Sequence, residues 1–184
     1  MSCNLIGIAG NGIGAGKSTV AQFFIDKGYK RSPFAAKLKE SIIALDPIID
    51  YENIEWGVEE VRVSTVLERM TLDEAKREYP ELRRLLQYMG TEVGRKLFGE
   101  NFWVDQILEN LGGTHAHFVI DDVRYPNEAE AIHNQGGIII FVERSSVESS
   151  LGHSSEAFNG VLRDMANIHL YNDGSVQDLY NKLN

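Results

Sequence analysis

A glycine-rich loop near the start of the chain ends in a lysine and two hydroxyl residues, in the sequence GNGIGAGKST of residues 10–19. Glycines allow a backbone to wrap inward so that several N–H groups point at one phosphate, and the lysine reaches the outer phosphate oxygens. The hydroxyl group that follows the lysine suits a Mg²⁺ ion, so we expect Ser18 as the metal ligand. The residues expected to hold a nucleoside triphosphate are Asn11, Gly12, Ile13, Gly14, Ala15, Gly16, Lys17, Ser18 and Thr19.

The spacing of this loop departs from the usual phosphate-binding pattern at one position. In the pattern G-x-x-x-x-G-K-[ST], the first glycine counted back from Gly16 falls on Asn11. Either Asn11 takes that place in a left-handed conformation, which Asn tolerates, or the loop starts at Gly10 and is one residue longer. The alternative is a glycine-rich turn without a ligand, and the lysine and hydroxyl residues that open a helix argue against it.

Two aspartates and an arginine follow a short apolar strand later in the chain. The strand of residues 117–120 runs into Asp121, Asp122 and Arg124. A carboxylate there can orient an acceptor oxygen or hold the water shell of Mg²⁺, and a neighbouring arginine can neutralise a moving phosphoryl group. We expect Asp122 and Arg124 to be catalytic, and the alternative is a helix-capping aspartate with a surface salt bridge.

A second arginine lies on a predicted helix, in a stripe beside the apolar face. Arg83, Gln87, Gly90 and Gly94 recur at helical spacing. Arg83 suits a phosphate, Gln87 could read a base edge, and the two glycines could let a ligand approach the backbone. Surface charge is the alternative for Arg83, and the pattern by itself leaves both interpretations open.

Alternating strand and helix signals indicate how these groups are positioned. Strands are expected at residues 5–9, 29–32, 117–120, 138–142 and 167–171, and helices at 17–27, 34–45, 80–98, 102–111, 127–134 and 175–183. This order predicts an α/β fold with a parallel sheet of about five strands flanked by helices. We expect one domain over 1–184, with a core at about 1–32 and 114–184 and a helical acceptor-binding region at about 33–113. Residues 48–80 give only weak helical signals.

Composition limits the classes of partner. The formal net charge is −9 over 184 residues, and so acidic a chain argues against a nucleic acid polymer or an anionic membrane as the main partner. Cys3 is the only cysteine, and the sequence has neither a membrane-spanning apolar run nor a signal-peptide pattern. A cytoplasmic protein is expected.

Several segments, in order along the chain, together resemble the bacteriophage deoxynucleoside monophosphate kinases. Besides the glycine loop they are FAAKLKE at 34–40, RRLLQYMGTE at 83–92, Trp103-Val104, DVRYPNE at 122–128, HSSE at 153–156 and NDG at 172–174. The resemblance implies a P-loop kinase fold and transfer of the γ-phosphoryl group of ATP to a deoxynucleoside monophosphate, with Mg²⁺ as cofactor. It also implies the cytoplasm of an infected bacterium as the location.

The resemblance also implies roles for individual residues. The catalytic positions are Lys17, Arg83, Asp122 and Arg124. The expected acceptor-binding residues are Lys39, Arg62, Arg83, Gln87, Gly90, Thr91, Trp103, Asp122, Arg124 and Glu128, although core packing is the alternative for Trp103. Arg144 and the loop Ser145–Ser155 leave a strand end, where we expect a closing lid or part of the adenine pocket.

Two other functions remain open on the sequence. The opening GIGAGKSTVA also resembles dephospho-coenzyme A kinases, but that family carries an acidic pair where this chain has Arg31-Ser32-Pro33-Phe34. A P-loop ATPase or nucleotide-sensing module is the other alternative, whereas the guanine-reading Asn-Lys-x-Asp of GTPases is missing. The sequence leaves open a homodimer.

Overall fold

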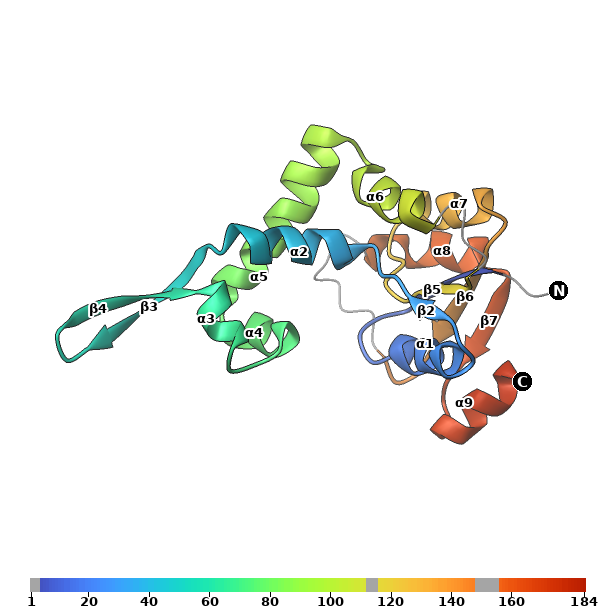
Figure 1. Ribbon diagram of the computed structural model, residues 1–184. Helices are drawn as coiled ribbons and strands as arrows, with labels where there is room; N and C mark the ends of the chain where they lie inside the picture. The colour runs from blue at the N-terminus through green and yellow to red at the C-terminus, as the bar shows by residue number, and fades with distance from the viewer. Residues whose placement is uncertain (1–3, 112–115, 148–155) are drawn as a thin grey trace. The chain divides into compact units, whose positions relative to one another are not determined.

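The computed structural model describes residues 4–111, 116–147 and 156–184 (Figure 1). The chain divides into two compact units. The first combines Met1–Phe34 with Val104–Asn184, and the second is Ala35–Trp103.

A five-stranded parallel sheet forms the centre of the first unit, with the strand order β2-β5-β1-β6-β7. The strands are β1 Leu5–Gly10, β2 Lys30–Arg31, β5 Phe118–Ile120, β6 Ile138–Glu143 and β7 Ile168–Tyr171. After β1 the chain first builds β2 and β5 on one side of it and later β6 and β7 on the other. Ligands of open parallel sheets bind beyond the carboxyl ends of the strands at such a switch in direction, which here is the glycine loop.

Helices cover both faces of this sheet (Figure 1). Helices α1 (Lys17–Asp26) and α9 (Val176–Leu183) lie on one face, and α7 (Pro126–Asn134) and α8 (Asn159–Met165) lie on the other. Alternate residues of a strand point to opposite faces: Ile6 and Ile8 join the core on the α1 side, whereas Gly7 lies against Ile132 of α7. The predicted sheet with flanking helices is therefore confirmed.

The second unit has its own hydrophobic core. Its elements are α2 (Ala35–Leu45), β3 (Ile48–Ile54), β4 (Gly57–Arg62), α3 (Val63–Leu67), α4 (Leu72–Glu78), α5 (Pro80–Tyr88) and the π-helix η1 (Met89–Phe98). The core residues are Ile42, Ile49, Val61, Val63, Val66, Ala75, Leu82 and Leu86. Helix α6 (Phe102–Leu111) starts at the end of this unit and continues into the first, and a short 3₁₀ turn, η2, spans Glu156–Phe158.

The region expected to be helical also contains an antiparallel hairpin. Strands β3 and β4 pair from Ile48 opposite Arg62 to Ile54 opposite Gly57. Most residues of both strands are exposed, and only Ile49 and Val61 are buried. A strand with two solvated faces lacks the alternation of apolar and polar residues by which strands are recognised, which explains why the sequence did not predict the hairpin.

The helix expected over residues 80–98 changes its geometry half-way. It is α-helical to Tyr88 and a π-helix from Met89 to Phe98. The indole N–H of Trp103 donates a 3.0 Å hydrogen bond to the carbonyl oxygen of Gly90 at the start of the π segment. A side chain that takes a helical carbonyl is a known cause of departure from α geometry.

Within the described ranges, no helix has both the length and the apolar character that crossing a bilayer requires.

Candidate active site

The glycine loop joins β1 to α1 at the carboxyl edge of the sheet. Gly14 and Gly16 have positive φ angles of 87° and 107°, which L side chains rarely adopt. Gly16 is the N-cap residue of α1, and the first turn of that helix holds no acidic residue. The ammonium group of Lys17 folds back over the loop and donates a 2.7 Å hydrogen bond to the carbonyl oxygen of Gly12. The loop therefore presents a helix N-terminus and a lysine, two groups that attract an anion.

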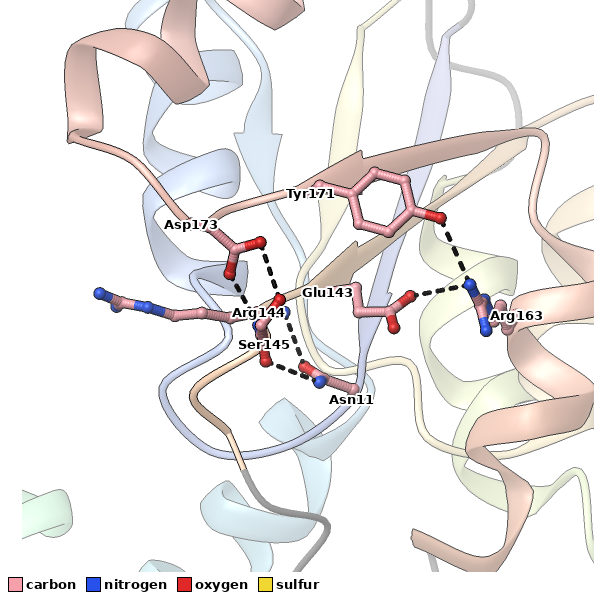
Figure 2. Close-up of polar contacts among 7 residues, drawn as sticks. All are labelled: Asn11, Glu143, Arg144, Ser145, Arg163, Tyr171 and Asp173. Carbon is pink, nitrogen blue, oxygen red and sulfur yellow. Dashed lines mark hydrogen bonds and ion pairs between the residues drawn. The ribbon is translucent and has the colours of Figure 1, made fainter.

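Asn11 does not adopt the left-handed conformation considered above, so that interpretation is wrong. Among the non-glycine residues of the described part, only Asp46 has a positive φ angle. Asn11 instead pairs with the backbone of Arg144: its Nδ2 donates to the carbonyl oxygen at 3.0 Å, and its Oδ1 accepts from the N–H at 3.2 Å (Figure 2). The Asn11 side chain thus joins the start of the loop to the end of β6.

A second contact joins the segments that follow β6 and β7. The backbone N–H and the hydroxyl of Ser145 both donate to the carboxylate of Asp173, at 2.7 and 2.9 Å (Figure 2). The backbone hydrogen bond from Ser145 is the largest reason why the pKa of Asp173 lies below its ordinary value. The side chain of Arg144 extends away from Asn11. Of the expected closing loop Ser145–Ser155, residues 148–155 lie outside the described part of the chain.

The end of β5 carries two carboxylates with different environments. Asp122 is half-buried, and its Oδ1 accepts a 2.8 Å hydrogen bond from the backbone N–H of Phe34. Asp121 is buried and forms an ion pair with Arg31 at the end of β2, with 2.7 Å between Nη2 and Oδ2. The Oδ1 atom of Asp121 is buried and has no hydrogen-bond partner among the described residues. The sequence indicated Asp122, but the carboxylate that the fold buries is Asp121.

Glu128 fixes the loop that carries Arg124. Its Oε2 accepts hydrogen bonds from the backbone N–H groups of Arg124 and Tyr125, at 2.7 and 3.1 Å, in the capping box of α7. The Glu128 side chain is buried, whereas Arg124 is exposed. The helix-capping role considered for the aspartates therefore belongs to Glu128.

The glycines of the stripe in the second unit face protein atoms. A Cβ at Gly94 would collide with the indole of Trp103, and one at Gly90 would lie 3.2 Å from Cδ2 of Leu38. Trp103 itself is buried. The idea that Gly94 leaves room for a ligand is therefore wrong, because the indole fills that space. Core packing, the alternative interpretation of Trp103, describes where its side chain lies.

The other expected acceptor residues of this unit are more open. Arg83 and Gln87 are exposed on α5, and Lys39 and Thr91 are half-buried. Arg62 is exposed at the base of the hairpin, where it pairs with Glu60 at 2.6 Å and donates to the carbonyl oxygen of Asp46 at 3.1 Å.

One hollow of the second unit is too small for a nucleotide. Its volume is about 50 Å³, whereas ligand pockets usually exceed about 300 Å³. It is lined by Glu52, Glu59, Glu60, Val61, Thr65, Val66, Arg69, Met70 and Tyr79. None of the expected acceptor residues is in this set, and the three glutamates would repel an anion.

Comparison with known proteins identifies the family. Residues 47–183 match the family model of deoxynucleotide monophosphate kinase. The chain belongs to the deoxynucleotide monophosphate kinase family. The sequence-based identification is thereby confirmed, and with it the prediction of a kinase.

Two viral members of this kinase family show how far the similarity extends. The deoxynucleotide monophosphate kinase of Escherichia phage RB69 is 33% identical over an alignment of 106 positions, which covers 55% of this chain and 43% of that protein. The chain therefore spans less than half of the RB69 enzyme in this alignment. A protein of Acanthamoeba polyphaga mimivirus, provisionally named a deoxynucleotide monophosphate kinase, is 30% identical over a gapped alignment of 201 positions, which covers 97% of this chain and 93% of that protein.

Among solved structures, the dephospho-CoA kinase of Campylobacter jejuni aligns over 97% of this chain and 93% of that chain. The TM-score is 0.46 and the identity 16%. A similarity of this size does not favour a dephospho-coenzyme A kinase over the family that the sequence matches.

In this family member, the fold brings four of the expected site residues of the first unit to the carboxyl ends of the strands. Lys17, Ser18, Asp122 and Arg144 all follow the carboxyl ends of strands in the parallel sheet. The expected residues Lys39, Arg62, Arg83, Gln87, Gly90, Thr91 and Trp103 belong to the other unit. Sequence reasoning missed the Arg31–Asp121 pair, whose only local signal is that Arg31 ends β2 and Asp121 directly follows β5.

Proposed function

We propose that this protein transfers the γ-phosphoryl group of ATP to the 5′-phosphate of a deoxynucleoside monophosphate, which gives ADP and the deoxynucleoside diphosphate. The single observation that supports this most strongly is the glycine loop with Lys17 at the N-terminus of α1, in a chain of the deoxynucleotide monophosphate kinase family. The loop supplies a binding place for the donor phosphates, and the family name supplies the class of acceptor.

On the donor side, the loop N–H groups and Lys17 gather the negative charge of the phosphates. The ammonium of Lys17 now bonds to the carbonyl oxygen of Gly12, a neutral acceptor that an anionic phosphate oxygen would replace with a stronger, charge-assisted bond. The first turn of α1 carries no carboxylate that would offset the positive end of the helix dipole and repel the phosphates. Arg144, half-buried after β6, is proposed to border the adenine end of ATP.

The residues present fit a Mg²⁺ ion bound together with ATP. Ser18 is exposed in the first turn of α1, and Asp122 follows β5, so a hydroxyl and a water-mediated carboxylate are available. The described residues contain no group of three or more His, Cys, Asp or Glu that could hold a metal ion by itself. Mg²⁺ in phosphoryl transfer takes most of its ligands from phosphates and water, and when bound it neutralises charge on the transferred group.

On the acceptor side, we propose that Asp122 orients the attacking phosphate oxygen and that Arg124 stabilises the moving phosphoryl group. The N–H of Phe34 holds the carboxylate of Asp122, and Glu128 holds the backbone of Arg124, so the loop that carries both residues is fixed. Glu128 is proposed to contribute to acceptor binding by holding this loop in place.

In the second unit we propose that Arg83 binds the acceptor phosphate and that Gln87 reads the base. Both are exposed on α5, and each directly follows one of the buried residues Leu82 and Leu86, which anchor the helix in the core. Lys39, Arg62, Gly90 and Thr91 are proposed as further acceptor residues, with Trp103 supporting Gly90 through its indole hydrogen bond.

The proposed surroundings follow from the substrates. Both are small anions of the cytoplasm, and the net charge of −9 disfavours nucleic acid polymers and anionic membranes as partners. We place the reaction in the cytoplasm of the infected host.

A coupled assay of ADP release tests this function. ATP, Mg²⁺ and each of the four deoxynucleoside monophosphates are supplied in turn, with dephospho-coenzyme A and no acceptor as the comparison reactions. We expect ADP release only with one or more monophosphates. Release without an acceptor would indicate an ATPase, and release only with dephospho-coenzyme A would indicate that kinase. Lys17→Ala is the control variant, which must lose the acceptor-dependent rate.

A further inference from the structure

We propose that Asn172 is a positioning residue of the glycine loop, which sets the orientation of the peptide between Ala15 and Gly16 and thereby the affinity for the phosphates of ATP. This inference rests on the proposed function in that ATP is taken as the ligand of the loop. Asn172 directly follows β7 and lies far from the loop in the sequence.

Hydrogen bonds hold both the backbone and the side chain of Asn172. Its backbone N–H donates a 2.7 Å hydrogen bond to the carbonyl oxygen of Glu143, which holds the residue against β6. Its side-chain Nδ2 donates a 2.8 Å hydrogen bond to the carbonyl oxygen of Ala15. The residue is 8% exposed, and moving a buried polar side chain away from its hydrogen-bond partner is costly.

The bond to Ala15 determines where the next amide points. A trans peptide is planar, so its C=O and N–H groups point in opposite directions. When Asn172 holds the carbonyl oxygen of Ala15, the N–H of Gly16 must point away from Asn172. In a glycine loop that precedes a helix, the N–H groups around the N-cap are those that face a bound phosphate. Asn172 therefore selects one of two orientations of this peptide.

Gly16 has the residue type that this contact needs. Its φ angle is 107°, and a Cβ built on it would collide with Nδ2 of Asn172. A side chain at Gly16 would therefore push the amide away from Ala15. Gly16, the glycine that the phosphate-binding pattern requires, thus also leaves room for the side-chain amide of Asn172, which follows β7.

Other hydrogen bonds join the start of the glycine loop and the segments after β6 and β7 to their neighbours. Asp173 ties Ser145 to the turn after β7, and Asn11 ties the start of the loop to Arg144 (Figure 2). Asn159 donates a 3.3 Å hydrogen bond to the carbonyl oxygen of Asn11. Asn172 differs from these residues because its side chain reaches the part of the loop next to Lys17.

Two substitutions separate this role from a general effect on folding. Asn172→Asp keeps the shape but places a carboxylate oxygen against the carbonyl oxygen of Ala15, which repels it. Asn172→Ala removes the donor without adding charge. Asn167→Ala is the matched control. Oδ1 of Asn167 accepts a 2.7 Å hydrogen bond from the backbone N–H of Ile139, near the amino ends of β6 and β7, whereas the glycine loop lies at the carboxyl ends of the strands.

The experiment measures the Kd of ATP with Mg²⁺ by calorimetry, without an acceptor, together with the thermal midpoint of each variant. We expect Asn172→Ala to weaken ATP binding by about tenfold, the size of one lost hydrogen bond, and Asn172→Asp to weaken it further. Asn167→Ala should bind ATP within twofold of the wild type although it also loses stability. The KM for the monophosphate should change by less than twofold in every variant.

Unchanged ATP affinity in folded Asn172→Ala would overturn the inference, and so would an equal loss in Asn167→Ala. If Asn172→Asp does not fold, the comparison of the two alanine variants decides. The outcome is separate from the proposed function: a wild type that binds ATP but phosphorylates no monophosphate would refute that function, while the ATP affinities would still decide the role of Asn172.

Discussion

Replacing Gly94 by alanine tests whether the glycine stripe of the second unit packs against protein or admits a ligand. A Cβ at this position would lie 2.5 Å from Cε2 and 2.9 Å from Cζ2 of Trp103, atoms of a rigid, buried ring. The indole must move, and its 3.0 Å hydrogen bond to Gly90 is lost with it. Gly94→Ala is therefore expected to destabilise the protein.

The magnitude follows from three contributions. Overpacking of a core costs about 1–3 kcal/mol, and the lost hydrogen bond costs about 1 kcal/mol. Replacing a helical glycine by alanine stabilises a helix by about 1 kcal/mol, which offsets part of this loss. The expected loss is about 2 kcal/mol in the free energy of unfolding, or a fall in Tm of about 4–8 °C for a chain of this size.

Gly90→Ala is the matched control on the same helix. Its Cβ would meet only Cδ2 of Leu38, at 3.2 Å, which is the end of a flexible side chain. We expect its stability to stay within about 1 kcal/mol of the wild type. Urea unfolding followed by circular dichroism measures both variants. If Gly94→Ala keeps full stability but loses turnover, the glycine faces a ligand and the packing explanation is refuted.

Three further predictions concern the proposed site and its support. Arg83→Ala should abolish turnover of the monophosphate while the Kd of ATP stays within twofold, as kinetics and calorimetry would measure; normal turnover would remove Arg83 from the site. Glu128→Ala leaves two backbone N–H groups without their carboxylate, so the free energy of unfolding measured in urea should fall by about 2–4 kcal/mol. Turnover should fall as well, and an unchanged unfolding midpoint would contradict this prediction. The lowered pKa of Asp173 means that its contact with Ser145 stabilises the fold at neutral pH and is lost as pH falls through that pKa. The stability difference between wild type and Asp173→Asn should therefore shrink in acid, and a difference that is constant from pH 7 to pH 3 would argue against the contact.

The elements that position the donor site could be predicted because their signals are local. Buried parallel strands are short apolar runs, and the glycine loop is written in consecutive residues ending at Lys17. The hairpin of residues 48–62 could not be predicted in this way, because both of its faces are largely solvated and its sequence has no alternation.

Contacts between segments that are distant in the sequence could not be predicted either. Nothing near Asp121 in the sequence says that its partner is Arg31, because parallel pairing of β2 with β5 brings the two together. The helical period predicted that Gly90 and Gly94 belong to one stripe. It could not say that Trp103, which follows the helix, would occupy the space beside Gly94.

Following the label of [γ-³²P]ATP into product tests the central claim most directly. The protein is incubated with labelled ATP, Mg²⁺ and a mixture of the four deoxynucleoside monophosphates, and the products are separated by thin-layer chromatography. We predict that the label appears in one or more deoxynucleoside diphosphates and that Lys17→Ala transfers none. Label found only in inorganic phosphate, or retained in ATP at every acceptor concentration, would contradict the proposed phosphoryl transfer.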